Sequence, residues 1–153
     1  MRYGQYVDTR IGKLYLAEEN NCLVRLDGGE ASEEDILQET ALLKKATQQL
    51  QEYFVGERQE FTLPLHMQGT EFQKKVWHAL MQIPYGETHT YGEIAKSVGC
   101  PGGARAVGGA CNRNPIMIVV PCHRVIGSNG KLVGFGGGVE MKEALLEQEG
   151  RII

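Results

Sequence analysis

Three short strand patterns occupy the first 26 residues and constrain the fold more than any other feature. The patterns cover Arg2–Asp8, Lys13–Ala17 and Leu23–Leu26, and the segments 9–12 and 18–21 between them are rich in turn residues. Because connections this short usually join neighbouring antiparallel strands, we expect a small sheet of three antiparallel strands.

A helical pattern follows the strands. From Ser32 to Val55 apolar residues recur close to every 3.6 positions, and Ser32 and Asp35 resemble a capping pair at the start of a helix. Gly56 ends the pattern, and the residues around Phe61–Leu63 predict a further strand.

The second half of the chain is mainly helical. Thr70–Gln73 and Thr90–Glu93 are capping-box patterns, and each predicts the start of a helix. The turn Gly99–Gly103 then leads to a third predicted helix at Ala104–Arg113. Two short helices joined by a glycine-containing turn are a candidate helix-turn-helix.

These patterns predict an α+β fold in two domains. We expect an N-terminal domain at residues 1–63 that combines a small antiparallel sheet with a helix. A linker at 64–69 connects it to a mainly helical domain at 70–153.

The third predicted helix contains Gly108 and Gly109. Each glycine costs a helix about 1 kcal/mol relative to alanine, so another interaction must favour them. One explanation is close packing of this helix on a neighbour, for which small residues are needed. The other is a slim helix that enters a narrow groove of a partner with Arg105 projecting from it, and the two explanations are compatible.

Composition and cysteine usage indicate a cytoplasmic globular protein without metal. The chain is 42% hydrophobic, yet no apolar run approaches the roughly 20 residues of a membrane span, and its first residues lack the apolar core of a signal peptide. Its four cysteines show no CxxC spacing, which predicts free thiols. Cys22 and His66 do not form a convincing ligand set, so we expect no bound metal.

Charge is unevenly distributed along the chain. The net charge of −3 argues weakly against a nucleic-acid partner. Residues 1–63, however, carry seven Lys and Arg against twelve Asp and Glu, whereas residues 64–153 carry nine against seven. The second half is therefore mildly basic, and the overall charge does not exclude DNA.

A thiol and an imidazole adjoin at the end of an apolar run. Ile116–Val120 is rich in β-branched residues and predicts a buried strand, which leads to Pro121, Cys122 and His123. A thiolate nucleophile forms most readily beside a base. Because neighbouring strand residues point to opposite faces, Cys122 and His123 interact only if the backbone turns there or a water bridges them.

The motifs after residue 70 resemble the O6-alkylguanine-DNA alkyltransferase family. They match its order and spacing throughout residues 70–150, whereas residues 1–63 match only in length and element pattern. The resemblance implies a ribonuclease H-like N-terminal domain and a winged-helix or helix-turn-helix-like C-terminal domain. The matching segments are Phe72-Gln73 with Val76-Trp77, Ile83–Gly86, Thr90–Ala95, Arg105–Gly108, Asn112–Pro115 and Pro121–Gly127.

The resemblance implies a DNA-repair reaction that each molecule performs once. An alkyl group, typically methyl, moves irreversibly from O6-alkylguanine in double-stranded DNA, and also from O4-alkylthymine, to Cys122. Guanine O6 lies within the base stack, so the base must first be flipped out of the duplex. The implied enzyme is a monomeric methylated-DNA–protein-cysteine methyltransferase that uses no cofactor and does not contact a membrane.

The resemblance also implies a role for each catalytic residue. Cys122 accepts the alkyl group, His123 deprotonates it through a water, and Glu149 holds the histidine. Asn114 ties the recognition helix to the acceptor segment, and Tyr91 acts on the flipped nucleotide and its leaving guanine. We further expect Cys122 to titrate below an ordinary thiol, because His123 and Glu149 stabilise its deprotonated form.

DNA contacts and a base pocket follow from the same resemblance. Arg105 fills the space left by the flipped base, and the small residues after it enter the minor groove. The implied DNA-binding residues are Arg105, Ala106, Gly108, Gly109, Arg113 and Tyr91. The implied pocket residues are Val125, Phe135, Gly136 and Gly137, three of them in a glycine-rich loop.

Two alternatives stay open at the level of sequence. The first is a non-catalytic protein that binds alkylated DNA lesions, although such proteins lack the acceptor cysteine. The second is a Cys-His thiol hydrolase with a small substrate, for which no oxyanion motif is visible.

Overall fold

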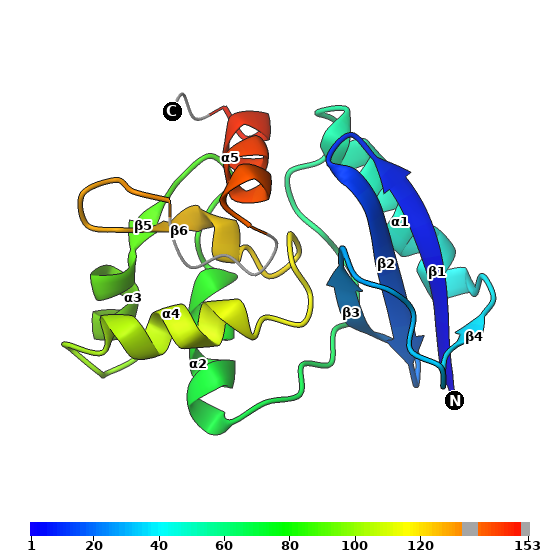
Figure 1. Ribbon diagram of the computed structural model, residues 1–153, viewed down its shortest axis with the longest axis horizontal. Coiled ribbons are helices and arrows are strands. Elements are labelled where there is room, and N and C mark those ends of the chain that lie inside the picture. The colour runs from blue at the N-terminus through cyan, green and yellow to red at the C-terminus, as the bar shows by residue number, and fades with distance from the viewer. Residues whose placement is uncertain (133–137, 151–153) are drawn as a thin grey trace. The chain divides into compact units, whose positions relative to one another are not determined.

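The computed structural model describes residues 1–132 and 138–150 and confirms the predicted α+β fold (Figure 1). The chain forms two compact units, Met1–Gln68 and Gly69–Ile153. Within the described residues, no helix has the length and apolar character needed to span a membrane.

The first unit contains a four-stranded sheet in the order β3-β2-β1-β4. Strands β1 (Arg2–Thr9), β2 (Gly12–Glu19) and β3 (Cys22–Asp27) are antiparallel neighbours, as predicted. Strand β4 (Ile36–Leu37) pairs in parallel with β1 and was not expected.

Helix α1 (Ala41–Phe54) packs on the sheet through Leu43, Ala46, Leu50 and Tyr53. Its N-cap is Thr40, whose hydroxyl accepts a hydrogen bond from the Leu43 amide at 3.1 Å. The prediction that this helix begins at Ser32 was therefore wrong.

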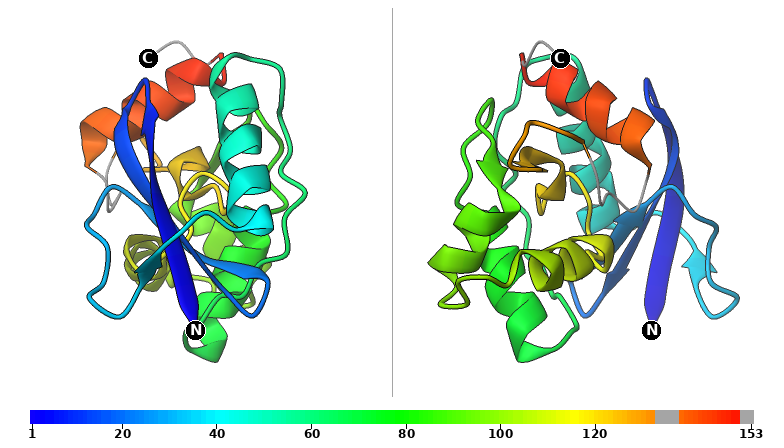
Figure 2. Two further views of the ribbon diagram at one scale, coloured as in Figure 1. Left: turned by 90° about the vertical axis from the view of Figure 1, so that its right-hand side faces the viewer. Right: turned by 60° about the vertical axis from the view of Figure 1, so that its left-hand side comes forward.

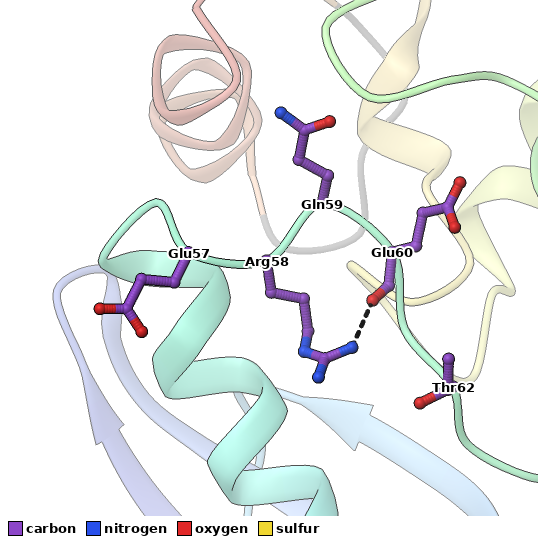
Figure 3. A pocket seen from close by; sticks show the side chains of 5 residues that line it. All are labelled: Glu57, Arg58, Gln59, Glu60 and Thr62. Carbon is purple, nitrogen blue, oxygen red and sulfur yellow. Dashed lines mark hydrogen bonds between the residues drawn. The ribbon is translucent and has the colours of Figure 1, made fainter.

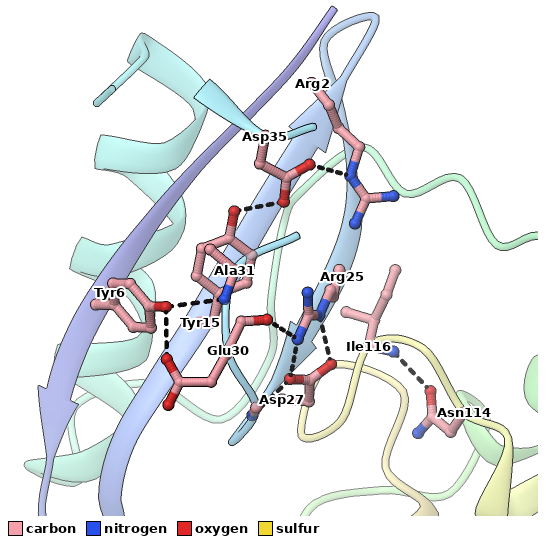
Figure 4. Close-up of polar contacts among 11 residues, drawn as sticks. Arg2, Tyr6, Tyr15, Arg25, Asp27, Glu30, Ala31, Asp35, Asn114 and Ile116 are labelled. Carbon is pink, nitrogen blue, oxygen red and sulfur yellow. Dashed lines mark hydrogen bonds and ion pairs between the residues drawn. The ribbon is translucent and has the colours of Figure 1, made fainter. Parts of the chain in front are cut away.

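The residues before α1 are held by the sheet, which explains its late start. Ile36 and Leu37 pair with β1, while the Asp35 carboxylate accepts a hydrogen bond from Tyr15 and forms a 2.9 Å ion pair with Arg2 (Figure 4). Asp35 thus binds groups of the sheet and does not cap a helix.

The strand predicted around Phe61–Leu63 is also absent from the described residues. Pairing occurs slightly later, where the Leu23 amide donates to Pro64 O at 2.8 Å and the His66 amide donates to Leu23 O at 3.0 Å. Part of the segment expected to be a linker is thereby hydrogen-bonded to β3.

A shallow polar hollow follows α1 (Figure 3). Its lining residues are Glu57, Arg58, Gln59, Glu60 and Thr62. The Arg58 guanidinium donates to Glu60 O at 2.9 Å and pairs with Glu52 at 2.8 Å. None of the predicted site residues lines this hollow.

The second unit consists of helices and one short strand pair. The helices are α2 (Glu71–Leu80), α3 (Tyr91–Ser97), α4 (Ala104–Asn112) and α5 (Val139–Gln148). Strand β5 (His89–Thr90) pairs in parallel with β6 (Val125–Ile126). A 3₁₀ turn, η1, covers Cys122–Arg124.

The predicted starts of α2 and α3 are confirmed. Thr70 and Thr90 each cap a helix, with Gln73 and Glu93 completing reciprocal capping boxes. Helices α3 and α4 pack against each other as a pair (Figure 2). The Trp77 indole of α2 donates to Ala110 O at 2.9 Å, which anchors the inner face of α4.

The prediction of a strand at Ile116–Val120 was wrong, because this segment forms a compact turn. The Val120 amide donates back to Ile116 O at 3.0 Å, and the Val119 amide donates to Met117 O at 2.9 Å. Ile118 lies at the centre of this second bond with φ of 74°, as in the rare γ-turn. The apolar run reflects burial, which a compact turn provides as well as a strand does.

Candidate active site

Two sharp turns bring Cys122 into the interior of the second unit. Pro121 has φ −82° and ψ 65°, and the Cys122 amide donates to Val120 O at 2.8 Å, which together describe an inverse γ-turn. The 3₁₀ turn η1 begins directly afterwards. The sequence predicted that Cys122 and His123 could interact only if the backbone turned at this point or a water bridged them. The structure has such a turn.

Asn114 connects the end of α4 to the turn at Val120–Cys122. Its side-chain amide donates to Val120 O at 2.7 Å and to Cys122 Sγ at 3.2 Å. Its carbonyl oxygen accepts from the Ile116 amide at 2.9 Å (Figure 4). One side chain therefore orients both the turn and the thiol within it.

The Cys122 thiol is 3% exposed, and this burial controls its ionisation. Burial raises the pKa of Cys122 to about 11, although the Asn114 hydrogen bond and the charge of Lys142 oppose the rise. The expectation that Cys122 titrates below an ordinary thiol is therefore corrected. Removing water from the thiolate outweighs the favourable contacts.

His123 is fully buried and interacts with Glu149. Its Nε2 lies 2.7 Å from Glu149 Oε2, whereas its buried Nδ1 has no hydrogen-bond partner among the described residues. Burial lowers the pKa of His123 despite the nearby carboxylate, so the ring is neutral. We assign the proton to Nε2, which leaves the Nδ1 lone pair available as a base.

Glu149, at the end of α5, is hydrogen-bonded by the guanidinium of Arg124 and the imidazole of His123. Arg124 donates to it through Nε at 2.7 Å and Nη2 at 2.9 Å, in addition to the His123 contact. Burial alone would raise the pKa of Glu149, but the hydrogen bonds from His123 and Arg124 hold it well below its usual range. The carboxylate is consequently ionised.

Tyr91, at the start of α3, is 9% exposed and accepts a hydrogen bond from Lys142 Nζ at 3.1 Å. Burial and the nearby Cys111 and Cys122 raise the pKa of Tyr91 above its ordinary value of 10.0. The hydroxyl therefore keeps its proton and can donate it in a hydrogen bond to a bound group.

Sequence reasoning did not assign a role to Lys142 or Arg124, although both are buried at the site. Lys142 shares the inner face of α5 with Leu145, Leu146 and Glu149, a spacing of three and four residues that could have identified it. Arg124 could have been anticipated because a buried carboxylate needs a cationic partner.

The outer face and end of α4 carry the predicted DNA-binding residues other than Tyr91, which is buried at the start of α3. Arg105, Ala106, Gly109 and Arg113 are exposed, and Gly108 is partly exposed. A Cβ at Gly109 would meet no described atom within 4 Å, and one at Gly108 would lie 3.9 Å from the Tyr91 ring. Packing among the described residues therefore does not require either glycine.

The remaining predicted residues are distributed as follows. Val125 is buried in β6, directly after η1. Phe135, Gly136 and Gly137 lie outside the described residues. In the part of the chain that the structure describes, no three His, Cys, Asp or Glu side chains are grouped as metal ligands.

Family models match both halves of the chain. The DNA-binding domain of 6-O-methylguanine DNA methyltransferase matches residues 71–151, and the ribonuclease-like domain of the same family matches residues 1–67. The chain belongs to the 6-O-methylguanine DNA methyltransferase family. This result confirms the resemblance found after residue 70 and extends it to the N-terminal unit.

Similar members of the 6-O-methylguanine DNA methyltransferase family share about half of their residues with this chain. The methylated-DNA–protein-cysteine methyltransferase of Mycobacterium leprae is 52% identical over 147 residues, covering 94% of this chain and 89% of the relative. The constitutive enzyme of Bacillus subtilis is 48% identical over 158 residues, covering 97% and 96%.

A solved structure agrees with the fold. The structure of Mycobacterium tuberculosis OGT in complex with DNA superposes with a TM-score of 0.90 at 48% identity, covering 96% of this chain and 92% of that one. The predicted two-part fold of this family is thereby confirmed.

Proposed function

We propose that this protein repairs DNA by transferring the alkyl group of O6-alkylguanine to its own Cys122. Its relatives are methylated-DNA–protein-cysteine methyltransferases, and a similar protein has been solved with DNA. The observation that carries the assignment of the acceptor is that the buried Cys122 directly precedes His123, whose buried ring contacts Glu149 and leaves Nδ1 unpaired among the described residues. A non-catalytic protein that only binds alkylated DNA does not need a buried thiol next to a histidine–carboxylate pair.

The reaction begins with proton transfer. A water passes the proton of Cys122 Sγ to Nδ1 of His123, and Glu149 stabilises the imidazolium that forms. Because burial raises the pKa of Cys122 to about 11, very little of the thiol is ionised at pH 7. Because so little thiolate exists beforehand, the base contributes directly to the rate.

The thiolate then attacks the alkyl carbon. A carbon–sulfur bond forms, the bond from this carbon to guanine O6 breaks, and guanine keeps the electron pair. The Tyr91 hydroxyl donates a hydrogen bond to the departing base, which stabilises its developing charge. The proton on His123 balances that charge until solvent protonates the guanine and takes up the proton of His123. The stable thioether ends the single turnover.

The outer face of α4 is proposed to enter the minor groove. Gly108 and Gly109 keep this face flat, so that the helix backbone approaches the DNA closely. Arg105 makes no hydrogen bond or ion pair within the described residues and is free to fill the space of the flipped base. Arg113, at the end of the same helix, binds phosphate.

The flipped guanine is proposed to bind beside Val125 and the loop with Phe135, Gly136 and Gly137. Of these residues, the structure describes only Val125. Activity on O4-alkylthymine, a monomeric state and a cytoplasmic location stay predictions from the sequence.

The test is the intact mass of the protein after incubation with an O6-methylguanine duplex. We expect one added methyl group for each chain, located on Cys122 by peptide mapping. Cys122→Ser should acquire none, whereas Cys111→Ser, which removes the other buried thiol, should still be methylated. Binding of the duplex without any adduct, or an adduct on Cys111, would overturn the proposal.

A further inference from the structure

The segment Ile83–Gly86 matches one of the family's motifs, but the proposed reaction gives it no role. It lies between α2 and β5, and three of its hydrogen bonds lead to Glu149 or to the residues next to and bound to this carboxylate. Ile83 O accepts from Arg124 Nη1 at 2.7 Å, and the Tyr85 hydroxyl donates to Gln148 O at 3.0 Å. The Gly86 amide lies 3.4 Å from Glu149 Oε1, toward which it donates.

The backbone conformation at position 86 favours glycine. Its φ of 84° is in the left-handed region, and a Cβ there would lie 3.4 Å from the backbone oxygen of Glu149. A side chain at this position would strain the backbone because of its positive φ, although its Cβ would lie at an ordinary contact distance from Glu149.

Arg124 joins this segment to Glu149. Two of its nitrogens bind the two oxygens of the carboxylate, and the third binds Ile83 O. Its side chain is 8% exposed, and the guanidinium carbon lies 5.8 Å from the Tyr85 ring centre. Only a planar fork with several donors can satisfy all of these acceptors at once.

We propose that Arg124 is a positioning residue which, together with Ile83–Gly86, fixes the Glu149 carboxylate and sets the acid limit of the alkyl transfer. This inference rests on the proposed function, because it assigns His123 as the base. Arg124 does not touch the reacting atoms, and it acts through Glu149 on His123.

The charges around His123 determine in which direction the acid limb of the rate profile should move when Arg124 is replaced. Glu149 favours the protonated ring, whereas Arg124 and Lys142 oppose it. Removing the charge of Arg124 therefore makes His123 easier to protonate, and a protonated ring cannot accept the proton of Cys122. The acid limb of the rate profile should move to higher pH.

The experiment measures alkyl transfer from a free alkylated guanine base against pH, with the adduct detected by mass. A free base avoids any change in DNA binding. We expect Arg124→Met to raise the midpoint of the acid limb by about one pH unit. Arg124→Lys keeps the charge but not the fork, so it should keep the midpoint while lowering the rate about tenfold.

Arg25→Met is the matched control, because Arg25 forms a comparable fork on Asp27 in the other unit, at 2.7 and 3.0 Å. It should leave both midpoint and rate unchanged. A wild-type midpoint in Arg124→Met would overturn the inference. If that variant does not fold, a wild-type rate in Arg124→Lys would do so.

The two proposals fail in different ways. If the wild-type protein forms no adduct, the proposed function fails. If the wild-type protein is alkylated on Cys122 and both Arg124 variants match it in rate and midpoint, only the positioning role fails.

Discussion

At the scale of single residues, burial shifts the pKa values of Cys122 and His123 more than their polar and charged neighbours do. Cys122 receives a hydrogen bond from Asn114 and lies near the charge of Lys142, yet its pKa rises to about 11. His123, in contact with a carboxylate, still has its pKa lowered. Both groups are therefore neutral at rest, and in the proposed reaction the thiol becomes nucleophilic when its proton moves to the histidine.

The first prediction concerns the reactivity of Cys122 toward a small thiol reagent in the absence of DNA. Modification should stay slow through pH 9 and rise toward pH 11, because burial disfavours the thiolate. Mass mapping of the labelled peptide against pH measures this midpoint. A midpoint at the ordinary value of 9.0 would contradict the raised pKa.

Asn114→Ala provides the comparison for this measurement. Loss of the amide donor removes an interaction that favours the thiolate, so the midpoint should move higher still. Asn112→Ala, an exposed substitution at the end of α4, should leave the midpoint at the wild-type value.

At the scale of elements, α4 combines an anchored inner face with a bare outer face. Trp77 and the buried Val107 and Ala110 hold the inner face, whereas the outer face carries Gly109 with open space around it. The glycine destabilises the helix without improving its packing. A glycine at this position is explained if the outer face approaches another molecule closely.

The second prediction separates stability from function at Gly109. Gly109→Ala should stabilise the protein by about 0.5–1 kcal/mol, because alanine favours the helix and its Cβ meets no neighbour. The same methyl group should weaken binding to duplex DNA and slow repair in the duplex. Urea unfolding and transfer assays with duplex and free-base substrates measure the two effects.

The free alkylated base is the internal control for Gly109→Ala, since α4 need not bind DNA for that substrate to react. Arg105→Ala should likewise slow repair in the duplex far more than reaction with the free base, but without a gain in stability. Equal losses on both substrates would show that α4 does not act through DNA.

At the scale of the whole molecule, the buried titratable groups link stability to pH. The pKa values of Glu149 and His123 are lowered in the folded protein, so the unfolded chain binds more protons in acid. Those of Cys122 and Cys111 are raised to about 11 and about 12, so the unfolded chain loses protons more readily in alkali.

The third prediction is therefore a loss of stability at both ends of the pH scale. The free energy of unfolding should fall as pH drops below 6.5, where unfolded histidine protonates, and further below 4.5. It should fall again above pH 9, the ordinary thiol pKa. Trp77, the single tryptophan of the chain, lets fluorescence follow the second unit during unfolding.

Two variants assign the two limbs of this stability profile. Cys111→Ala should reduce the loss above pH 9, because one buried thiol is removed, and should leave the acid limb unchanged. Glu52→Gln, which breaks a partly exposed ion pair with Arg58, should change stability by less than about 1 kcal/mol at any pH. Stability that does not change between pH 6.5 and pH 4 would contradict the roles of His123 and Glu149.

Features that depend on residues close together in the chain could be predicted from the sequence. The three antiparallel strands and the capping boxes at Thr70 and Thr90 follow from patterns only a few residues long. The order of motifs also identified the family and singled out Cys122 among four cysteines. Such features are local because propensity, capping and turn formation act over one or two helical turns.

The turn at Ile116–Val120, the late start of α1 at Ala41 and the neutral state of Cys122 became visible only in the folded chain. Each depends on burial or on partners far along the chain. Glu149 meets His123 across 26 positions and Gly86 across 63. A local pattern cannot encode these contacts, because water exclusion and electrostatics act through space once the chain has folded.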